Sequence, residues 1–164
     1  MRITSSVEYA TRVMVRLSML KENETMNADR LSVIENVPRD YIDQLMLRLR
    51  RAGLVQSRRG AQGGYALAKP SGKISLGMIV RAVEESVFDY VCDRYARGQR
   101  ICKRTGDCGI RPVWRKLAAI VEAFLDRVTI EQISRDEPCM DARVEMLFAS
   151  SPAFSKAARK TTKS

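Results

Sequence analysis

The chain has 164 residues, 45% of them apolar, which is enough to bury the core of one principal domain and excludes an intrinsically disordered protein. Lys and Arg outnumber Asp and Glu by 29 to 19, a net charge of +10. No apolar run approaches the ~20 residues that a bilayer span needs, and the N-terminal sequence lacks a signal-peptide core, so we expect a cytoplasmic protein outside the membrane.

Two helices are predicted at the start of the chain. Apolar residues recur at helical spacing over residues 5–21. After a polar turn, Asn27 can cap a shorter helix that runs to residue 35, and Asn36 followed by Pro38 ends it. Asn tolerates the left-handed conformation that such a turn needs.

A third helix is predicted from Pro38, which suits a first helical turn, to residue 52, and Gly53 ends it. One face of this helix is apolar. The opposite face carries side chains that donate or accept hydrogen bonds: Arg39, Asp40, Asp43, Gln44, Arg48 and Arg51. Two helices joined by a tight turn, the second with such a face, are typical of a helix-turn-helix.

Two strand-like runs follow, over residues 54–60 and 65–68, around the glycine-rich tip Gly60-Ala61-Gln62-Gly63-Gly64. A helix-turn-helix followed by such a hairpin predicts a winged helix, whose wing would bring Arg58 or Arg59 to a minor groove or a phosphate. Eight basic residues stand against two acidic ones between positions 38 and 73. This clustering favours a polyanion, either nucleic acid or an acidic membrane, as the partner.

Three further helices are predicted in the second half. Ser75 caps the first of them, whose inward residues are Leu76, Ile79, Val80 and Val83. Pro112 opens a long helix to about residue 127, with an apolar stripe formed by Trp114, Leu117, Ala118, Val121, Phe124, Leu125 and Val128. Because a small winged domain cannot cover this stripe, we interpret the helix as a dimerisation helix. Thr129 and Gln132 predict a capping box on a short final helix, and residues 136–164 are expected to form a flexible basic tail.

Three of the four cysteines, Cys92, Cys102 and Cys108, lie close together in a hydrophilic, basic segment that contains glycine. A basic setting favours the thiolate, the form that binds metals or reacts. The spacing differs from the paired Cys-x2-Cys of zinc ribbons, and the chain has no histidine. An iron–sulfur cluster, zinc, a thiol–disulfide switch and chemically inert cysteines are the possible interpretations, of which a bound metal or cluster is favoured. A reducing cytoplasm disfavours structural disulfides.

Segments scattered along residues 1–135 agree, in order, with one known pattern: Met1-Arg2-Ile3-Thr4, Tyr9-Ala10, Tyr41-Ile42-Asp43-Gln44-Leu45, Leu49-Arg50-Arg51-Ala52-Gly53-Leu54-Val55, Arg59-Gly60-Ala61-Gln62-Gly63-Gly64-Tyr65, Ala82-Val83-Glu84, and the three cysteines followed by Trp114. In these segments the chain resembles the IscR, NsrR and RirA type of bacterial winged-helix transcription regulator.

The resemblance implies a homodimer that binds a pseudo-palindromic operator in double-stranded DNA and carries an iron–sulfur cluster between the winged domain and the dimerisation helix. It implies that Asp40, Tyr41, Asp43 and Gln44 lie in the major groove and that Arg59 and its neighbours lie in the minor groove. It also implies that Cys92, Cys102 and Cys108 bind iron, in a 2Fe-2S cluster by preference or a 4Fe-4S cluster.

Two features depart from the family pattern. The first two cysteines are further apart than the family's commonest five intervening residues, and Arg111 replaces the histidine that follows the third cysteine in the IscR type. Some relatives recruit an acidic residue from helix 1 of the partner subunit, a position that Glu8 occupies here. Glu8 is therefore the candidate fourth ligand, with Asp107, Cys139 or an exogenous thiol as alternatives, and Cys139 is expected to be a spare thiol.

The predicted fold is mainly α with a small β-hairpin wing. It divides into a winged helix-turn-helix DNA-binding domain (1–84), a cysteine-containing sensor loop (85–111), a dimerisation helix with a short final helix (112–135) and the tail (136–164). The DNA-binding residues are predicted to be Arg39, Asp40, Tyr41, Asp43, Gln44, Arg48, Arg51, Arg58, Arg59 and Gln62.

The predicted function is a dimeric transcription regulator that senses iron, redox state or nitric oxide. A thiol- or zinc-dependent regulator of the same fold is the nearer alternative. An electron carrier or enzyme is disfavoured because the sequence has no histidine, no nucleotide fingerprint and no nucleophile–base motif.

Overall fold

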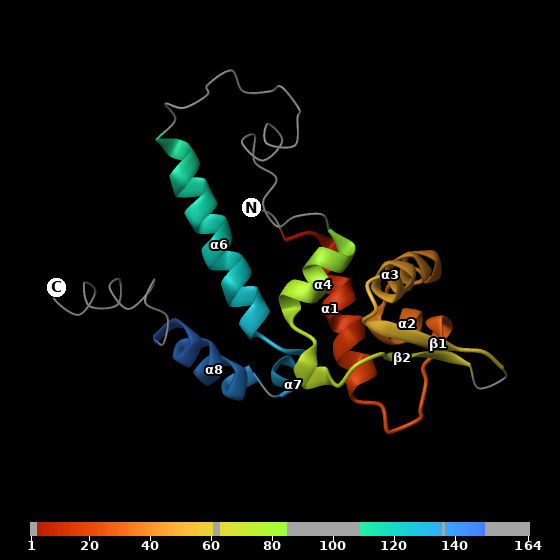
Figure 1. Ribbon diagram of the computed structural model, residues 1–164. Coiled ribbons are helices and arrows are strands. Elements are labelled where there is room, and N and C mark those ends of the chain that lie inside the picture. The colour runs from red at the N-terminus through yellow and green to blue at the C-terminus, as the bar shows by residue number, and fades with distance from the viewer. Residues whose placement is uncertain (1–2, 61–62, 85–108, 136, 150–164) are drawn as a thin grey trace, which may run out of the picture.

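The structure, a computed structural model, describes residues 3–60, 63–84, 109–135 and 137–149 (Figure 1). Its helices are α1 (Ser5–Ser18), α2 (Ala28–Glu35), α3 (Arg39–Arg51), α4 (Leu76–Val83), α6 (Ile110–Arg127), α7 (Ile130–Ile133) and α8 (Glu137–Ala149), with a 3-10 turn η1 (Ser71–Lys73). Strands β1 (Val55–Arg58) and β2 (Gly64–Leu67) form an antiparallel hairpin. The predicted fold class, mainly helical with a small hairpin, is confirmed.

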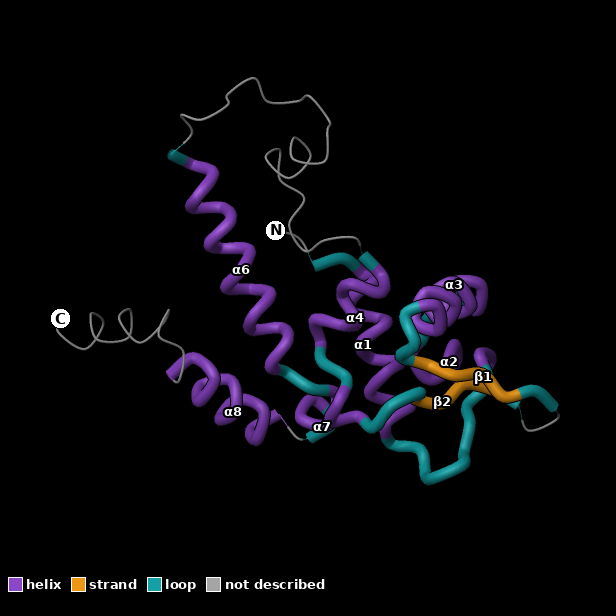
Figure 2. The backbone as a smooth tube through the Cα atoms, viewed as in Figure 1, coloured by secondary structure: helices purple, strands orange, loops and turns teal. Residues whose placement is uncertain are grey.

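Helix α1 is the centre of the core, and it contacts α2, α3, α4, α7 and β2 (Figure 2). Its buried side chains recur at helical spacing: Val7, Ala10, Val13, Met14 and Leu17. They meet the apolar faces of α3 and α4, whose innermost residues, such as Leu49 and Ile79, are fully buried. Packing these faces together removes apolar surface from water, and this hydrophobic effect is the main contribution to the stability of the short helices.

The turn between α2 and α3 forms as the sequence predicted. The side chain of Asn27 caps α2 by accepting a hydrogen bond from the backbone N–H of Arg30, and Asn36 takes a left-handed conformation with φ 52°. Glu35, buried at the end of α2, accepts hydrogen bonds from Arg12 and Arg16 of α1 at 3.0 and 3.1 Å. Because a buried carboxylate is costly unless it is paired, this contact fixes α2 against α1.

The hairpin follows α3 after a tight turn in which Gly53 has φ 67°. Val55 pairs with Leu67 at the open end of the hairpin, and Arg58 pairs with Gly64 next to the connecting loop. Within β2, Tyr65 exchanges two backbone hydrogen bonds with Met26, which anchors the hairpin to the loop between α1 and α2. A side chain at Gly64 would meet the Met26 backbone at 2.7 Å, so glycine is needed for this close approach.

Helix α6 is held to the winged domain at its C-terminal end. Asp126 forms an ion pair with Arg81 of α4 at 2.6 Å, and the Ser75 hydroxyl, which caps α4, lies 3.4 Å from the same carboxylate. The capping box of Thr129 and Gln132 then starts α7, as predicted. From this anchored end α6 extends away from the rest of the molecule (Figure 1).

Two boundaries in the second half of the chain differ from the sequence-based prediction. Helix α6 begins at Ile110, so Pro112 lies within its first turn. Backbone N–H groups in a first turn have no partner within the helix, so proline, which lacks an N–H, removes no hydrogen bond there. Residues 137–149, expected to belong to the tail, form α8. Its apolar and charged residues are intermixed around the helix, and the sequence therefore lacks the periodic stripe that predicts amphipathic helices. Residues 150–164 lie outside the described part of the chain.

Candidate nucleic-acid interface

The outward face of α3 and the hairpin lie on the same side of the molecule, away from α6 and α8 (Figures 1 and 2). Asp40, Gln44 and Arg51 on α3 and Arg59 after β1 are exposed. Within the described ranges these four side chains make no hydrogen bond or ion pair, so they are available to an external partner. Their guanidinium, amide and carboxylate groups are the kinds that contact phosphates and base edges.

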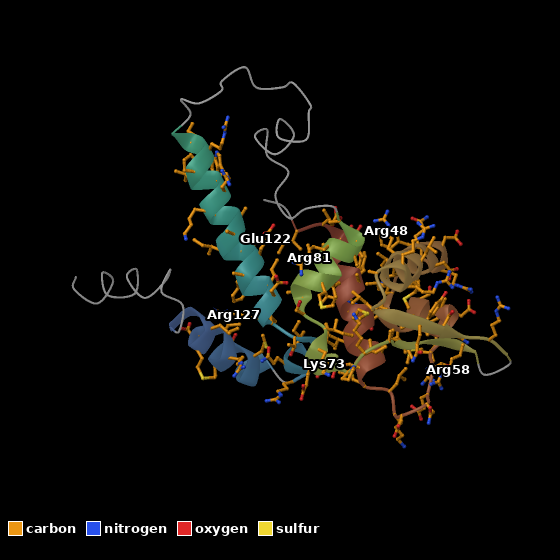
Figure 3. The ribbon with its side chains drawn as sticks, viewed as in Figure 1. Arg48, Arg58, Lys73, Arg81, Glu122 and Arg127 are labelled. Carbon is orange, nitrogen blue, oxygen red and sulfur yellow. The ribbon has the colours of Figure 1, made fainter. Side chains whose placement is uncertain are left out.

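Two predicted DNA contacts on α3 are engaged within the protein. The Tyr41 hydroxyl lies 2.7 Å from the Ser6 hydroxyl, and its ring meets Tyr9 edge-on at 6.0 Å between centroids. Arg48 donates a hydrogen bond of 2.9 Å to the backbone carbonyl of Val83, the last residue of α4 (Figure 3). Both side chains therefore join α3 to neighbouring helices.

On the wing, Arg58 and Arg59 differ in their surroundings. The Arg58 guanidinium donates to the backbone carbonyl of Asn23 at 2.8 Å and to its side-chain oxygen at 3.3 Å, which ties β1 to the α1–α2 loop (Figure 3). Arg59, the residue after β1, is exposed and makes no such hydrogen bond within the described ranges. Gln62, predicted at the wing tip, lies outside the described residues.

Arg39, the first residue of α3, bridges two carboxylates. Its Nε lies 3.1 Å from Oδ2 of Asp43, one turn later, and its Nη1 donates to Oδ1 of Asp29 in the first turn of α2. Desolvation lowers the pKa of Arg39, but the hydrogen bonds and charges of Asp29 and Asp43 outweigh it and raise that pKa above its ordinary value. The guanidinium therefore remains charged, and the three side chains form one ionic cluster between α2 and α3.

Two members of this face were missed from the sequence. Arg50 is exposed and donates to the Ser57 hydroxyl of β1 at 3.4 Å. Arg50 lies seven residues after Asp43, a spacing that places both on the same face of a helix, so the sequence could have predicted it. Asp29 gave no such signal, because its contact with Arg39 exists only after the turn brings α2 and α3 together.

The predicted sensor cysteines Cys92, Cys102 and Cys108 lie outside the described residues, between the end of α4 and the start of α6. Glu8, the candidate fourth ligand, is exposed in the first turn of α1. Thr4, which precedes α1, donates a hydrogen bond of 2.6 Å to Glu84, the last described residue before the cysteines. Glu84, the residue that precedes the cysteine segment in the chain, therefore lies beside the N-terminal end of α1, and the first turn of α1 carries Glu8.

The described ranges hold neither a cluster of metal ligands nor a membrane-spanning helix. No group of three or more His, Cys, Asp or Glu side chains in them could hold a metal ion. None of the helices in this part of the chain is both long and apolar enough to cross a membrane.

A helix-turn-helix packed on a two-stranded wing, with a basic outward face, defines a winged-helix DNA-binding protein. The chain belongs to the Rrf2 family, described as iron-dependent transcriptional regulators, whose sequence pattern matches residues 3–136. It is thus a transcription regulator of that family, and the predicted resemblance is confirmed.

Among the curated relatives, the HTH-type transcriptional regulator IscR of Pectobacterium carotovorum is 31% identical over 141 residues, which cover 86% of this chain and 84% of IscR. Among solved structures, CymR, the global cysteine regulator of B. subtilis, superimposes with a TM-score of 0.67 at 25% identity, covering 82% of this chain and 96% of CymR. T. potens IscR gives a TM-score of 0.62 at 27% identity and covers 81% and 85% of the two chains.

Proposed function

We propose that the protein is a homodimeric, sequence-specific DNA-binding regulator that senses iron, redox state or nitric oxide through an iron–sulfur cluster held by Cys92, Cys102 and Cys108. The observation that carries this proposal is the connection of the cysteine segment to the DNA-binding face. The segment follows α4, whose last carbonyl accepts the hydrogen bond from Arg48 of α3.

The donor set fits a cluster. Three thiolates in a basic segment match the ligands that iron–sulfur clusters and zinc take, and Glu8 is an exposed carboxylate in the first turn of α1. When bound, a cluster supplies a centre whose presence depends on iron and on oxidants. Joining three thiolates to one centre would constrain the segment between α4 and α6. Val83 and Glu84, which precede this segment, are bonded to Arg48 of α3 and to Thr4 at the start of α1.

Dimerisation through α6 completes the proposal. The N-terminal half of this helix exposes four apolar side chains at helical spacing: Ile110 (60%), Val113 (60%), Trp114 (44%) and Leu117 (39%). The same stripe on a second copy of the chain would cover these side chains. The resulting dimer would carry two α3 helices, one for each of two operator half-sites about one DNA turn apart.

A thiol-redox regulator is the second candidate. The likeness to CymR favours it, because CymR of Staphylococcus aureus has been solved in an oxidized form and matches this chain with a TM-score of 0.65 at 25% identity. The absorbance spectrum of anaerobically purified protein, with iron and acid-labile sulfide analysis, decides between them. Colourless protein that still binds DNA would favour the thiol or zinc interpretation, and protein with a cluster but without salt-dependent DNA binding would instead be an electron carrier.

Arg59→Ala is expected to weaken operator binding by ~1–3 kcal/mol if the side chain enters a groove, and by less if it contacts only phosphate. Titration of labelled operator at fixed salt measures the change. Lys73→Ala, an exposed cation on η1, is the matched control and should bind as the parent does. Unchanged affinity in Arg59→Ala would remove the wing from the proposed interface.

Asp43→Ala and Gln44→Ala are each expected to relax base preference more than they lower overall affinity. A carboxylate can accept a hydrogen bond from cytosine N4, and a glutamine amide can pair with adenine N6 and N7. Selection from randomised operators reports the preferred bases directly. An unchanged motif in both variants would contradict the assignment of these two side chains to the major groove.

A further inference from the structure

The ionic cluster of Arg39, Asp29 and Asp43 is unusual for the start of a helix. Arg39 is the first residue of α3, where the positive end of the helix dipole disfavours a cation. An acidic residue ahead of a basic one is also the better order for an i, i+4 pair, and here the order is reversed. The pair is therefore poorly placed to stabilise α3 by itself, which points to a role outside helix stability.

The guanidinium has several donors in a fixed plane, so it can bind two carboxylates at the same time. Its Nε donates a hydrogen bond to Oδ2 of Asp43, and its Nη1 donates one to Oδ1 of Asp29. All three side chains remain about half exposed or more. Oδ1 of Asp43 has no hydrogen-bond partner among the described residues, so it is free to accept a bond from outside.

The hydrogen bond from Arg39 fixes Oδ2 of Asp43 and leaves Oδ1 exposed to an external donor. A carboxylate that rotates freely accepts hydrogen bonds from many directions, whereas one held at Oδ2 accepts through Oδ1 in a narrower range.

We propose that Arg39 is a positioning residue for sequence specificity, which orients the Asp43 carboxylate toward a base edge and joins it to α2 through Asp29, instead of contacting the DNA backbone itself. This inference rests on the proposed reading of DNA by Asp43.

The test compares Arg39→Gln, Asp43→Asn and the double variant in selections from randomised operators. Arg39→Gln should reduce discrimination at the same operator position as Asp43→Asn, by about 5- to 150-fold, the range that one good base contact provides. The double variant should be no less selective at that position than Asp43→Asn alone, because Arg39 acts through Asp43. The salt dependence of binding should stay as in the parent protein.

A uniform loss of affinity with an unchanged motif, and a salt slope smaller by about one per subunit, would mean that Arg39 binds phosphate, and would overturn the inference. An unchanged motif in Asp43→Asn would instead overturn the proposed base reading by Asp43, and the positioning role with it, while leaving DNA binding intact.

Two further variants separate positioning from loss of charge or of fold. Arg30→Gln removes an exposed arginine from α2 that has no side-chain partner in the described ranges, and it should leave base preference unchanged. Arg39→Lys keeps the charge but lacks the planar fork, so it should restore discrimination only in part. Thermal melting should be nearly the same in all variants, because exposed ion pairs add little stability.

Discussion

Cys102→Ala is expected to abolish the visible absorbance of the anaerobically purified protein and to change its affinity or sequence preference for at least one operator. Cys102 is the central member of the three predicted ligands, and two remaining thiolates are too few to hold the proposed cluster. Without a shared centre, the three cysteines are not joined, so the presence of a cluster can no longer act on α3 and α1 through the contacts of Arg48 with Val83 and of Thr4 with Glu84. Absorbance spectra, iron and sulfide analysis and operator titrations measure these effects.

Cys139→Ala is the control for this experiment. Cys139 lies in α8, and we predict that its removal leaves both the spectrum and DNA binding near those of the parent protein. The dimer should persist in both variants, because α6 is untouched. Equal DNA binding by cluster-loaded parent and Cys102→Ala protein at every operator would rule out the proposed switch, although not the winged-helix assignment.

Leu117→Arg is expected to convert the protein to a monomer and to lower affinity for a full operator by roughly 10²- to 10⁴-fold. Leu117 lies on the exposed apolar stripe of α6, where a charge at a subunit interface would be buried without a partner. A dimer binds its second half-site at a high effective concentration, and that gain is lost when the subunits separate. Sedimentation measures the mass, and titrations with full and single half-site DNA measure the affinity.

Arginine was chosen because added positive charge cannot by itself weaken DNA binding. Ala119→Arg places the same charge on the exposed, opposite side of α6 and should remain dimeric. Affinity of the Leu117→Arg protein for a single half-site should match that of the parent, since α3 and the wing are unchanged. A Leu117→Arg protein that stays dimeric would contradict the assignment of α6 as the dimerisation helix.

The local elements of the winged domain could be predicted because their signals are local. Asn27, Ser75 and Thr129 cap helices through bonds to residues three positions away. Gly53 and Asn36 mark turns through their own backbone preferences, and both adopt positive φ. Helix α8 was missed because its weak amphipathicity gives no periodic signal.

The roles of individual arginines depended on the tertiary structure. From the sequence, Arg39, Arg48, Arg58 and Arg59 are equivalent cations on one basic surface. After folding, Arg48 bonds to the end of α4, Arg58 to the α1–α2 loop and Arg39 to two carboxylates, whereas Arg59 remains exposed without such a contact among the described residues.

The amino-acid sequence by itself determined the order of the winged-helix elements, the basic character of the DNA-facing side and the family, because helix periodicity, caps, glycine turns and charge are properties of short segments. Only the tertiary structure decided which cations face outward and which join α3 to its neighbours. The physical reason is that Arg48 and Val83, or Arg58 and Asn23, are 35 residues apart in the chain, and their contacts exist only when the core around α1 brings those segments together.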